Sequence, residues 1–126
     1  MIATVVEDPE TGAIFFARRR EGGLFGGLWE PPMVEAGSVG EARDVLGKVG
    51  VSLGKMKLLE TGRITHVLTH RRLLVTVVSA RRVKGFKAQE ELGEPYEKAA
   101  WLDPDKPGVG VSTLARKVIA ATRAVE

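Results

Sequence analysis

The first third of the chain holds two short apolar runs followed by a loop rich in glycine and proline. Residues 2–7 and 13–19 are mostly apolar and β-branched, and the sequence Asp-Pro-Glu-Thr-Gly at 8–12 lies between them. This pattern predicts two strands joined by a turn. Residues 21–37 contain five glycines and two prolines, which favours a loop with special backbone angles over a helix. We expect Trp29 to anchor this loop to the core.

Two segments show apolar residues at helical spacing. Within residues 40–49 the apolar positions fall at i, i+3, i+4 and i+7, which predicts a short amphipathic helix with Ala42, Val45, Leu46 and Val49 on one face. Gly47 weakens this helix by about 1 kcal/mol relative to Ala, and Gly50 is a suitable C-terminal stop. Near the end of the chain, Ser112 or Thr113 can cap a second helix. Its apolar face consists of Leu114, Ala115, Val118, Ile119 and Ala121, and its other side carries Arg116, Lys117 and Arg123.

The middle of the chain has the pattern of a sheet. Residues 58–59 and 63–69 are typical of extended chain, and 73–80 are so nearly apolar that we expect a central strand covered on both faces. Residues 87–95 and 103–110 are expected to be loops, with a short strand at 99–102 between them. The order of elements indicates one α/β (α+β) domain over residues 1–126, in which a mixed β-sheet is sandwiched between helices.

Composition excludes several kinds of chemistry. The absence of cysteine rules out disulfides, cysteine-bound zinc, iron–sulfur clusters and thiol catalysis within this chain. Its 19 Lys and Arg against 16 Asp and Glu give a net charge of +3, which permits phosphate binding without predicting it. The chain has no apolar run of the roughly 20 residues that a transmembrane helix needs, and its N-terminus lacks a secretory pattern. We expect a cytoplasmic monomer.

The two histidines, His66 and His70, stand four residues apart. On a helix this spacing would place both on one face as a metal pair. The flanking residues favour a strand, on which four residues span about 13 Å, too far for a shared metal. Two interpretations remain: one packed and one exposed histidine, or a recognition loop that uses Thr69 and His70 as hydrogen-bonding groups. We predict no metal site.

Basic residues occur in three clusters, at 18–20, 71–72 and 81–84. Adjacent residues of a strand point to opposite faces, so each cluster places only part of its charge on one side. The clusters are either solvated surface or a surface that follows DNA phosphates. The pair Glu90-Glu91 is expected to lie in a solvated loop. No Ser-His-Asp arrangement is present, and residues 22–27 lack the lysine of a phosphate-binding loop, so we predict no catalytic residue.

Three segments match, in order, the motifs of one family. Residues 18–32, RRREGGLFGGLWEPP, resemble the stretch RRPxxGLLgGLWEFP, and residues 66–73, HVLTHRRL, resemble HxFSHxxL or HxxTHxxL. Residues 111–118, preceded by Trp101, resemble a closing PTPMRKV helix. All three motifs belong to the C-terminal domain of the MutY family of adenine DNA glycosylases. This resemblance covers nearly the whole chain and implies a Nudix-like fold, similar to that of the 8-oxo-dGTP hydrolase MutT.

The resemblance also implies a function in base excision DNA repair. The family's domain grips the 8-oxoguanine that lies opposite the target adenine, and its Phe-Ser-His loop corresponds here to Leu68, Thr69 and His70. Contacts to the DNA backbone are expected from Arg20, Arg71 and Arg72. The implied partners are duplex DNA with an 8-oxoguanine:adenine mispair and the glycosylase catalytic domain. No cofactor is expected in this chain, since the family's iron–sulfur cluster belongs to that catalytic domain.

An active Nudix hydrolase needs the motif G-x5-E-x7-R-E-U-x-E-E-x-G-U, whose glutamates hold Mg²⁺. Aligned on Gly50-Val51, the chain keeps Arg43 and an acid at Asp44, but the glutamate pair has become Gly47 and Lys48. Hydrolase chemistry is therefore disfavoured. The alternative is a divergent hydrolase of oxidised nucleotides that uses Glu35, Asp44 and loop acids. A third interpretation is a protein-interaction module.

Overall fold

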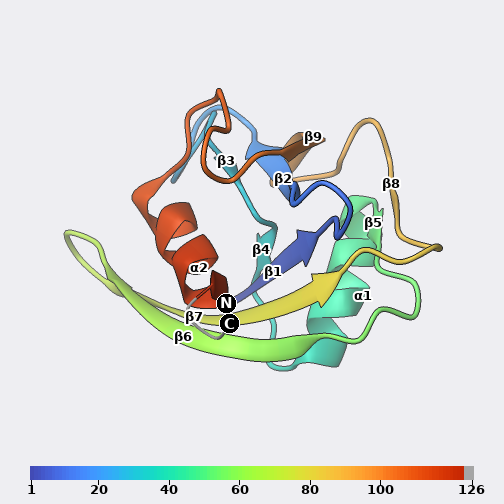
Figure 1. Ribbon diagram of the computed structural model, residues 1–126. Helices are drawn as coiled ribbons and strands as arrows, with labels where there is room; N and C mark the ends of the chain where they lie inside the picture. The colour runs from blue at the N-terminus through green and yellow to red at the C-terminus, as the bar shows by residue number, and fades with distance from the viewer. Residues whose placement is uncertain (124–126) are drawn as a thin grey trace.

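A computed structural model describes residues 1–123 (Figure 1). The elements run in the order β1 (Ile2–Glu7), β2 (Ile14–Arg19), β3 (Trp29–Glu30), β4 (Met33–Val34), α1 (Val39–Val49), β5 (Val51–Ser52), β6 (Leu59–Val67), β7 (Arg72–Arg81), β8 (Lys87–Ala88), β9 (Tyr96–Leu102) and α2 (Thr113–Arg123). The main sheet has the path β3-β2-β1-β7-β6, with β4 beside β1 and β9 beside β2. Strands β1 and β7 are parallel, whereas β6 and β7 form an antiparallel hairpin. The sheet is therefore mixed, as predicted.

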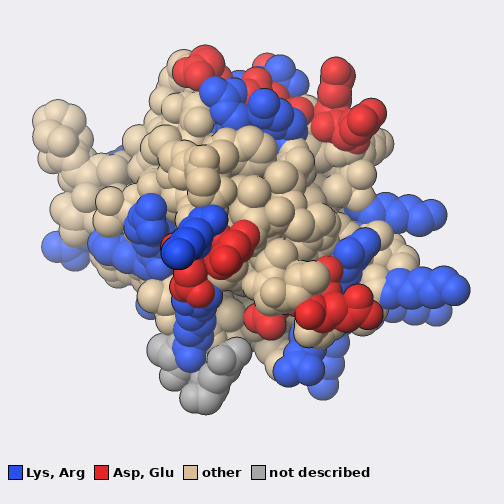
Figure 2. Space-filling view, turned by 45° about the horizontal axis from the view of Figure 1, so that its top comes forward, with Lys and Arg blue, Asp and Glu red and all other residues tan. Residues whose placement is uncertain are grey.

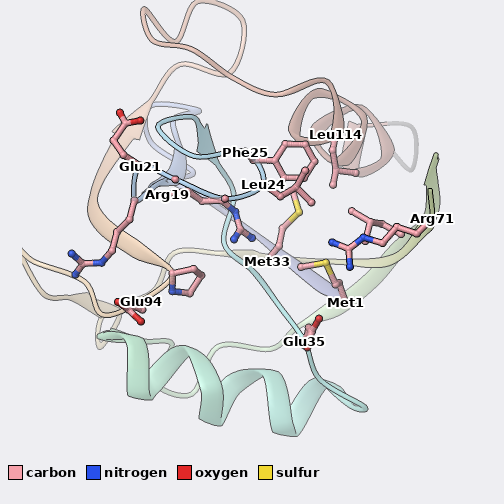
Figure 3. Close-up of a pocket in the computed structure, with 15 residues that line it drawn as sticks. Met1, Arg19, Glu21, Leu24, Phe25, Met33, Glu35, Arg71, Glu94 and Leu114 are labelled. Carbon is pink, nitrogen blue, oxygen red and sulfur yellow. The ribbon is translucent and has the colours of Figure 1, made fainter. Parts of the chain in front are cut away.

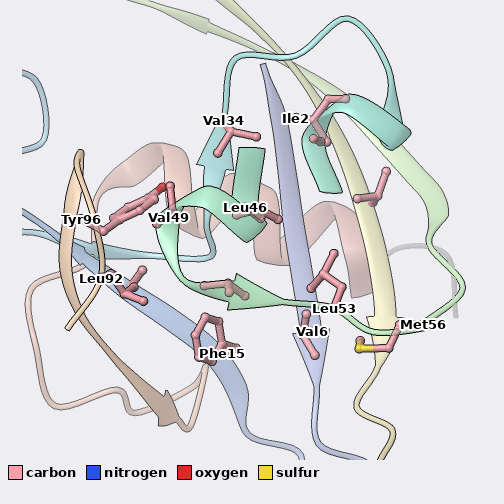
Figure 4. Packing of buried hydrophobic residues seen from close by; sticks show 14 residues of the cluster. Ile2, Val6, Phe15, Val34, Leu46, Val49, Leu53, Met56, Leu92 and Tyr96 are labelled. Carbon is pink, nitrogen blue, oxygen red and sulfur yellow. The ribbon is translucent and has the colours of Figure 1, made fainter. Parts of the chain in front are cut away.

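Strand β1 contacts both helices because its side chains alternate between the faces of the sheet. Ile2 and Val6 belong to a buried cluster with Ala42, Leu46 and Val49 of α1 (Figure 4). Ala3 and Val5 belong to a second cluster, which contains Leu114, Ala115, Val118 and Ile119 of α2. The prediction of a sheet sandwiched between helices is thus confirmed, and both predicted apolar helix faces are buried.

Both helices begin where a serine caps them. The Ser38 Oγ accepts a hydrogen bond from the Glu41 backbone N–H at 3.1 Å, and the Ser112 Oγ accepts one from Ala115 at 3.0 Å. Ser112 is therefore the cap of α2, and Thr113 is its first helical residue. Helix α1 ends at Gly50, whose φ of 114° lies in the left-handed region that favours glycine. No helix within residues 1–123 is long and apolar enough to cross a membrane.

Replacing each of two glycines in the α1 segment by alanine is expected to change the stability of the domain in opposite directions. A Cβ at Gly50 would meet the Gln89 Oε1 at 3.0 Å and would strain the positive φ, so Gly50→Ala should destabilise the domain by about 1–2 kcal/mol. Gly47 lies exposed inside the helix with nothing within 4 Å of a built Cβ, so Gly47→Ala should stabilise it by about 0.5–1 kcal/mol. Urea unfolding measures both. Equal effects would contradict the assignment of Gly50 as the end of the helix.

Several predicted segments differ from the structure. The loop predicted at 87–95 contains β8, and the strand predicted at 99–102 begins at Tyr96. The segment 63–69 is not extended throughout, because β6 ends at Val67 and the Leu68 N–H donates to the Arg71 carbonyl at 2.7 Å to close a turn. The strand predicted at 73–80 is interior, but only Val75, Val77 and Val78 within it are buried, and Leu74 remains 69% exposed. The reason is that α1 covers only one end of the sheet. The short strands β3, β4, β5 and β8 went unpredicted.

Candidate functional site

The hairpin of β6 and β7 projects from the body of the molecule and places its turn far from α1 (Figure 1). Val67 is paired with Arg72 across the hairpin, and the Leu68–Arg71 hydrogen bond leaves Thr69 and His70 as the two residues of the turn. Both turn residues are exposed, and Leu68 is half-buried. The structure therefore brings the three residues expected to contact the lesion together at one projecting tip.

The hairpin belongs to a segment without negative charge. Residues 61–89 contain seven Lys and Arg and no Asp or Glu, so all 16 acidic residues lie outside this segment. Figure 2 shows Lys and Arg side chains in separate groups on the viewed face, several of them beside Asp or Glu, with uncharged areas between them. The net charge is therefore not spread evenly, and the acid-free segment is a local source of positive charge. Sequence reasoning missed this signal, which needs only a count of acids along the chain.

The two histidines have different surroundings. The half-buried His66 on β6 faces α2, where its Nδ1 lies 3.2 Å from the Lys117 Nζ and its ring centroid lies 6.2 Å from that of Phe25. Since the Lys117 ammonium can only donate, His66 Nδ1 acts as the acceptor. His70 is exposed in the turn. The structure thus holds one packed and one exposed histidine, an arrangement that is compatible with a recognition loop at Thr69 and His70. Among residues 1–123 no three His, Asp or Glu side chains are grouped so that they could hold a metal ion.

A cavity of about 460 Å³ lies beside the hairpin turn. Figure 3 shows Arg71 reaching toward it from the hairpin and Glu35 from the segment just before α1, while Leu24 and Phe25 form another part of its wall. Arg20 lines it as well. Two of the three arginines expected to contact DNA thus share one cavity. Arg72, the first residue of β7, does not line the cavity.

The glycine-rich loop at 22–27 forms one wall of the cavity. Phe25 has a φ of 61°, which is uncommon for a residue with a bulky side chain. Its ring is held against the buried cluster beneath α2. Gly22, Gly23 and Gly27 also have positive φ values, between 78° and 85°. The predicted loop with special backbone angles is confirmed, and its strained residue lies at the cavity, where such strain is often functional.

A buried ionic network lies beside the cavity, which two of its members, Arg19 and Met33, line. The Arg19 Nε donates to the Glu30 Oε1 at 2.9 Å, and the Tyr96 hydroxyl donates to the Glu30 Oε2 at 2.6 Å. The same hydroxyl accepts a hydrogen bond from the Met33 N–H at 2.7 Å. Burial raises the pKa of Glu30, and the hydrogen bond from Arg19 opposes that rise. Burial, together with the charge of Glu30, also raises the pKa of Tyr96 well above its ordinary value. Sequence analysis singled out neither Glu30 nor Tyr96.

The basic cluster at 18–20 is mostly neutralised within the fold. Arg18 forms ion pairs with Glu21, at 2.8 Å, and with Glu97. Arg19 is paired with the buried Glu30. Arg20 is exposed, and its Nη2 donates to the Leu92 carbonyl at 3.2 Å. Of this cluster, Arg20 alone has no acidic ion-pair partner among residues 1–123, so most of the cluster's charge is paired within the fold.

Helix α1 carries the segment that aligns with the Nudix motif, in which the glutamate pair is replaced by Gly47 and Lys48. Arg43 is structural, since its guanidinium donates to the carbonyls of Gly54 and Met56 at 2.8 and 2.7 Å. Gly47 and Lys48 are exposed where the family has its glutamate pair, and Asp44 is exposed on the helix without lining the cavity. Of the acids in the hydrolase alternative, Glu35 does line it. These residues do not fit the Mg²⁺ site that the Nudix motif implies.

A comparison with models of protein families shows to which family the chain belongs. The model of the NUDIX domain matches residues 2–121. This chain belongs to the NUDIX domain family. A search among curated protein sequences finds no significant match.

Solved Nudix structures cover nearly all of the chain. The C-terminal domain of mouse MUTYH, in complex with human PCNA, is 23% identical, with a TM-score of 0.74 over 98% of this chain and 86% of that one. The NUDIX domain of Shewanella oneidensis NrtR, in complex with ADP ribose, is 11% identical, with a TM-score of 0.74 over 98% and 84%. The E. coli dihydroneopterin triphosphate pyrophosphohydrolase is 14% identical, with a TM-score of 0.67 over 98% and 92%. At these identities the likeness establishes the Nudix fold, which enzymes and other proteins share.

Proposed function

We propose that this Nudix domain recognises 8-oxoguanine opposite adenine in duplex DNA, as the lesion-recognition part of an adenine DNA glycosylase in base excision repair. The observation that carries the proposal is the projecting hairpin, which exposes Thr69 and His70 at its turn within a segment that lacks acids. A groove flanked by phosphates attracts such a tip and repels an acidic one. The same proposal includes, as a partner, the glycosylase catalytic domain, which would hold the iron–sulfur cluster. It also includes a cytoplasmic location.

The chemistry of the lesion suits the turn. Oxidation of guanine converts N7 from an acceptor to an N–H donor and adds a carbonyl at C8. The hydroxyl of Thr69, or a backbone carbonyl of the turn, can accept a hydrogen bond from this N–H, which guanine does not offer. Leu68 is aliphatic where the family has an aromatic residue, so it can press beside a base step without stacking on it.

Removing the Thr69 hydroxyl should reduce discrimination between the two bases. One base-edge contact is worth about 1–3 kcal/mol, so Thr69→Ala should narrow the ratio of the two dissociation constants roughly tenfold. Fluorescence anisotropy at several salt concentrations measures this ratio. One duplex carries 8-oxoguanine opposite adenine, and the other carries guanine opposite adenine.

The matched control is Thr113→Ala, which removes an exposed hydroxyl on α2 and should leave the ratio unchanged. An unchanged ratio in Thr69→Ala would refute the role assigned to this side chain. Failure of the wild-type domain to bind either duplex at low salt would refute the DNA-binding function and favour a protein-interaction module.

The cavity supports a second candidate function, hydrolysis of an oxidised nucleotide. Its volume of about 460 Å³ lies in the usual range for small-molecule sites, and Arg20, Arg71 and Glu35 line it. The loss of the glutamate pair at Gly47 and Lys48 speaks against this candidate. Magnesium-dependent release of pyrophosphate from 8-oxo-dGTP would favour hydrolysis. DNA binding without such release would favour the recognition module.

A further inference from the structure

Among residues 1–123, no element covers one face of the β6–β7 hairpin. Ile64 and Leu73 pack on the buried cluster beneath α2, and His66 contacts Lys117 of that helix. Because side chains alternate along a strand, the residues between them point away from α2. Thr65 is paired with Leu74 and Val67 with Arg72. These four residues, together with Arg63, are here called the bare face.

Helix α1 does not reach the bare face. Among the residues of β7, its cluster contains only Val78 and Ala80, at the end of the strand away from the turn. Figure 1 likewise shows α1 beneath the far end of the sheet, while the hairpin extends beyond it. Val67 is therefore 68% exposed and Leu74 69% exposed, although they are diagonal neighbours on one face. Their exposure is unusual, since the residues of β7 that lie beneath α1 or α2 are covered.

Positive charge flanks this apolar pair on both sides. Arg72 lies beside Val67 across the hairpin, and Arg63 lies four pairs further from the turn, with its side chain 81% exposed. Arg63 contacts Glu60 at 2.8 Å, near the root of the hairpin. Apart from this contact, the nearest acids in sequence lie beyond residue 89. The bare face thus combines an apolar centre with cations at its two ends.

We propose that the bare face lies in a groove of duplex DNA, with Val67 and Leu74 against sugars and base edges and Arg63 and Arg72 toward the flanking phosphates. This proposal rests on the proposed function and extends it from the turn to the body of the hairpin. A two-stranded ribbon has the width that the major groove admits. Phosphates on both sides of a groove complement the two cations, and the apolar edges between them complement the apolar pair.

The test is a double variant, Val67→Thr with Leu74→Thr. Threonine is β-branched, a shape that favours strands, and both positions are exposed, so the thermal midpoint should not change. The apolar contact should be lost, and binding to both duplexes should weaken roughly tenfold. Since no charge is removed, the slope of log K against log salt should remain that of the wild type. Anisotropy titrations at four salt concentrations give both quantities.

Leu59→Thr is the matched control, because Leu59 is a 55% exposed leucine at the root of the same hairpin. It should bind DNA as the wild type does. Unchanged binding by the double variant, alongside a narrowed base preference in Thr69→Ala, would overturn this inference and leave the proposed function intact. Absence of any DNA binding by the wild type would overturn both. A wild-type dimer in sedimentation that the double variant abolishes would assign the bare face to self-association and would also overturn the inference.

Discussion

Replacing Glu30 by alanine is expected to destabilise the domain by about 3–5 kcal/mol, because it leaves a buried cation without its counter-charge. The side chain of Glu30 is 1% exposed, and that of its partner Arg19 is 15% exposed. The substitution also removes the acceptor that lies 2.6 Å from the Tyr96 hydroxyl. Urea unfolding monitored by tryptophan fluorescence measures this loss of stability. An unchanged m-value indicates that Glu30→Ala and the wild type unfold in the same way.

The same carboxyl should make stability depend on pH. Burial raises the pKa of Glu30 in the folded state, although the hydrogen bond from Arg19 lowers it in part. The folded state therefore holds the proton more tightly than the unfolded chain, in which the pKa is about 4.3. The stability that this carboxyl contributes is fully present below the pKa of the unfolded chain and is lost as the pH rises through the pKa of the folded state. The advantage of the wild type over Glu30→Ala should accordingly shrink as the pH rises above about 4.

Tyr96→Phe is the control for the ionic part of this network. It removes the hydroxyl that accepts from Met33 and donates to Glu30 but leaves the ion pair with Arg19 in place. Its cost should be about 1–3 kcal/mol, that of an unsatisfied buried group, and so smaller than that of Glu30→Ala. A loss below 1 kcal/mol in Glu30→Ala would show that Arg19 can turn into the solvent of the cavity, and the network would not then hold the fold together.

The elements that carry a long periodic pattern could be predicted from the sequence. Helix α1 has four apolar positions at helical spacing, a capping serine and a terminal glycine, and all of these signals are local. The two-residue strands have no period to detect. Strand β4 exists because Met33 and Val34 pair with Ala3 and Ile2, about thirty positions earlier. Pairing over such a separation depends on the assembled sheet, so a local pattern does not reveal it.

The candidate site likewise has parts that could be predicted from the sequence and parts that could not. The loop at residues 68–70 was found because a contiguous family motif carries it, whereas the apolar pattern alone extended the strand to Thr69, two residues past its end at Val67. The cavity is lined by the N-terminus, the glycine-rich loop, the segment before α1 and the start of β7. No single segment of the sequence therefore predicts it. Glu30 was missed because its partners lie 11 and 66 residues away, and an acid in a loop normally faces water.

The motif of the catalytic helix illustrates why a fold does not fix an activity. Arg43 persists in this chain, and its contacts with Gly54 and Met56 explain its presence by structure alone. The positions that would hold a metal can change without cost to the core, because Gly47 and Lys48 are exposed and the buried face of α1 lies elsewhere. The scaffold therefore remains intact while the site on it differs.

Removing the two cations beside the turn should weaken DNA binding by about a hundredfold at 0.1 M salt. Each phosphate contact contributes about 0.9 to the slope of log K against log salt. The double variant Arg71→Gln with Arg72→Gln should therefore reduce that slope by about 2 and weaken binding to both duplexes equally, since phosphates carry no base identity.

The control, Arg81→Gln with Lys84→Gln, removes two exposed cations of the same acid-free segment at the other end of β7, roughly 30 Å away. If both double variants lower the slope alike, the contact is with the general charge of the segment, and the hairpin turn is not the DNA-binding element. If only the turn variant lowers it, while the ratio of affinities for the two duplexes is kept, Arg71 and Arg72 position the domain on the backbone and leave base recognition to the turn.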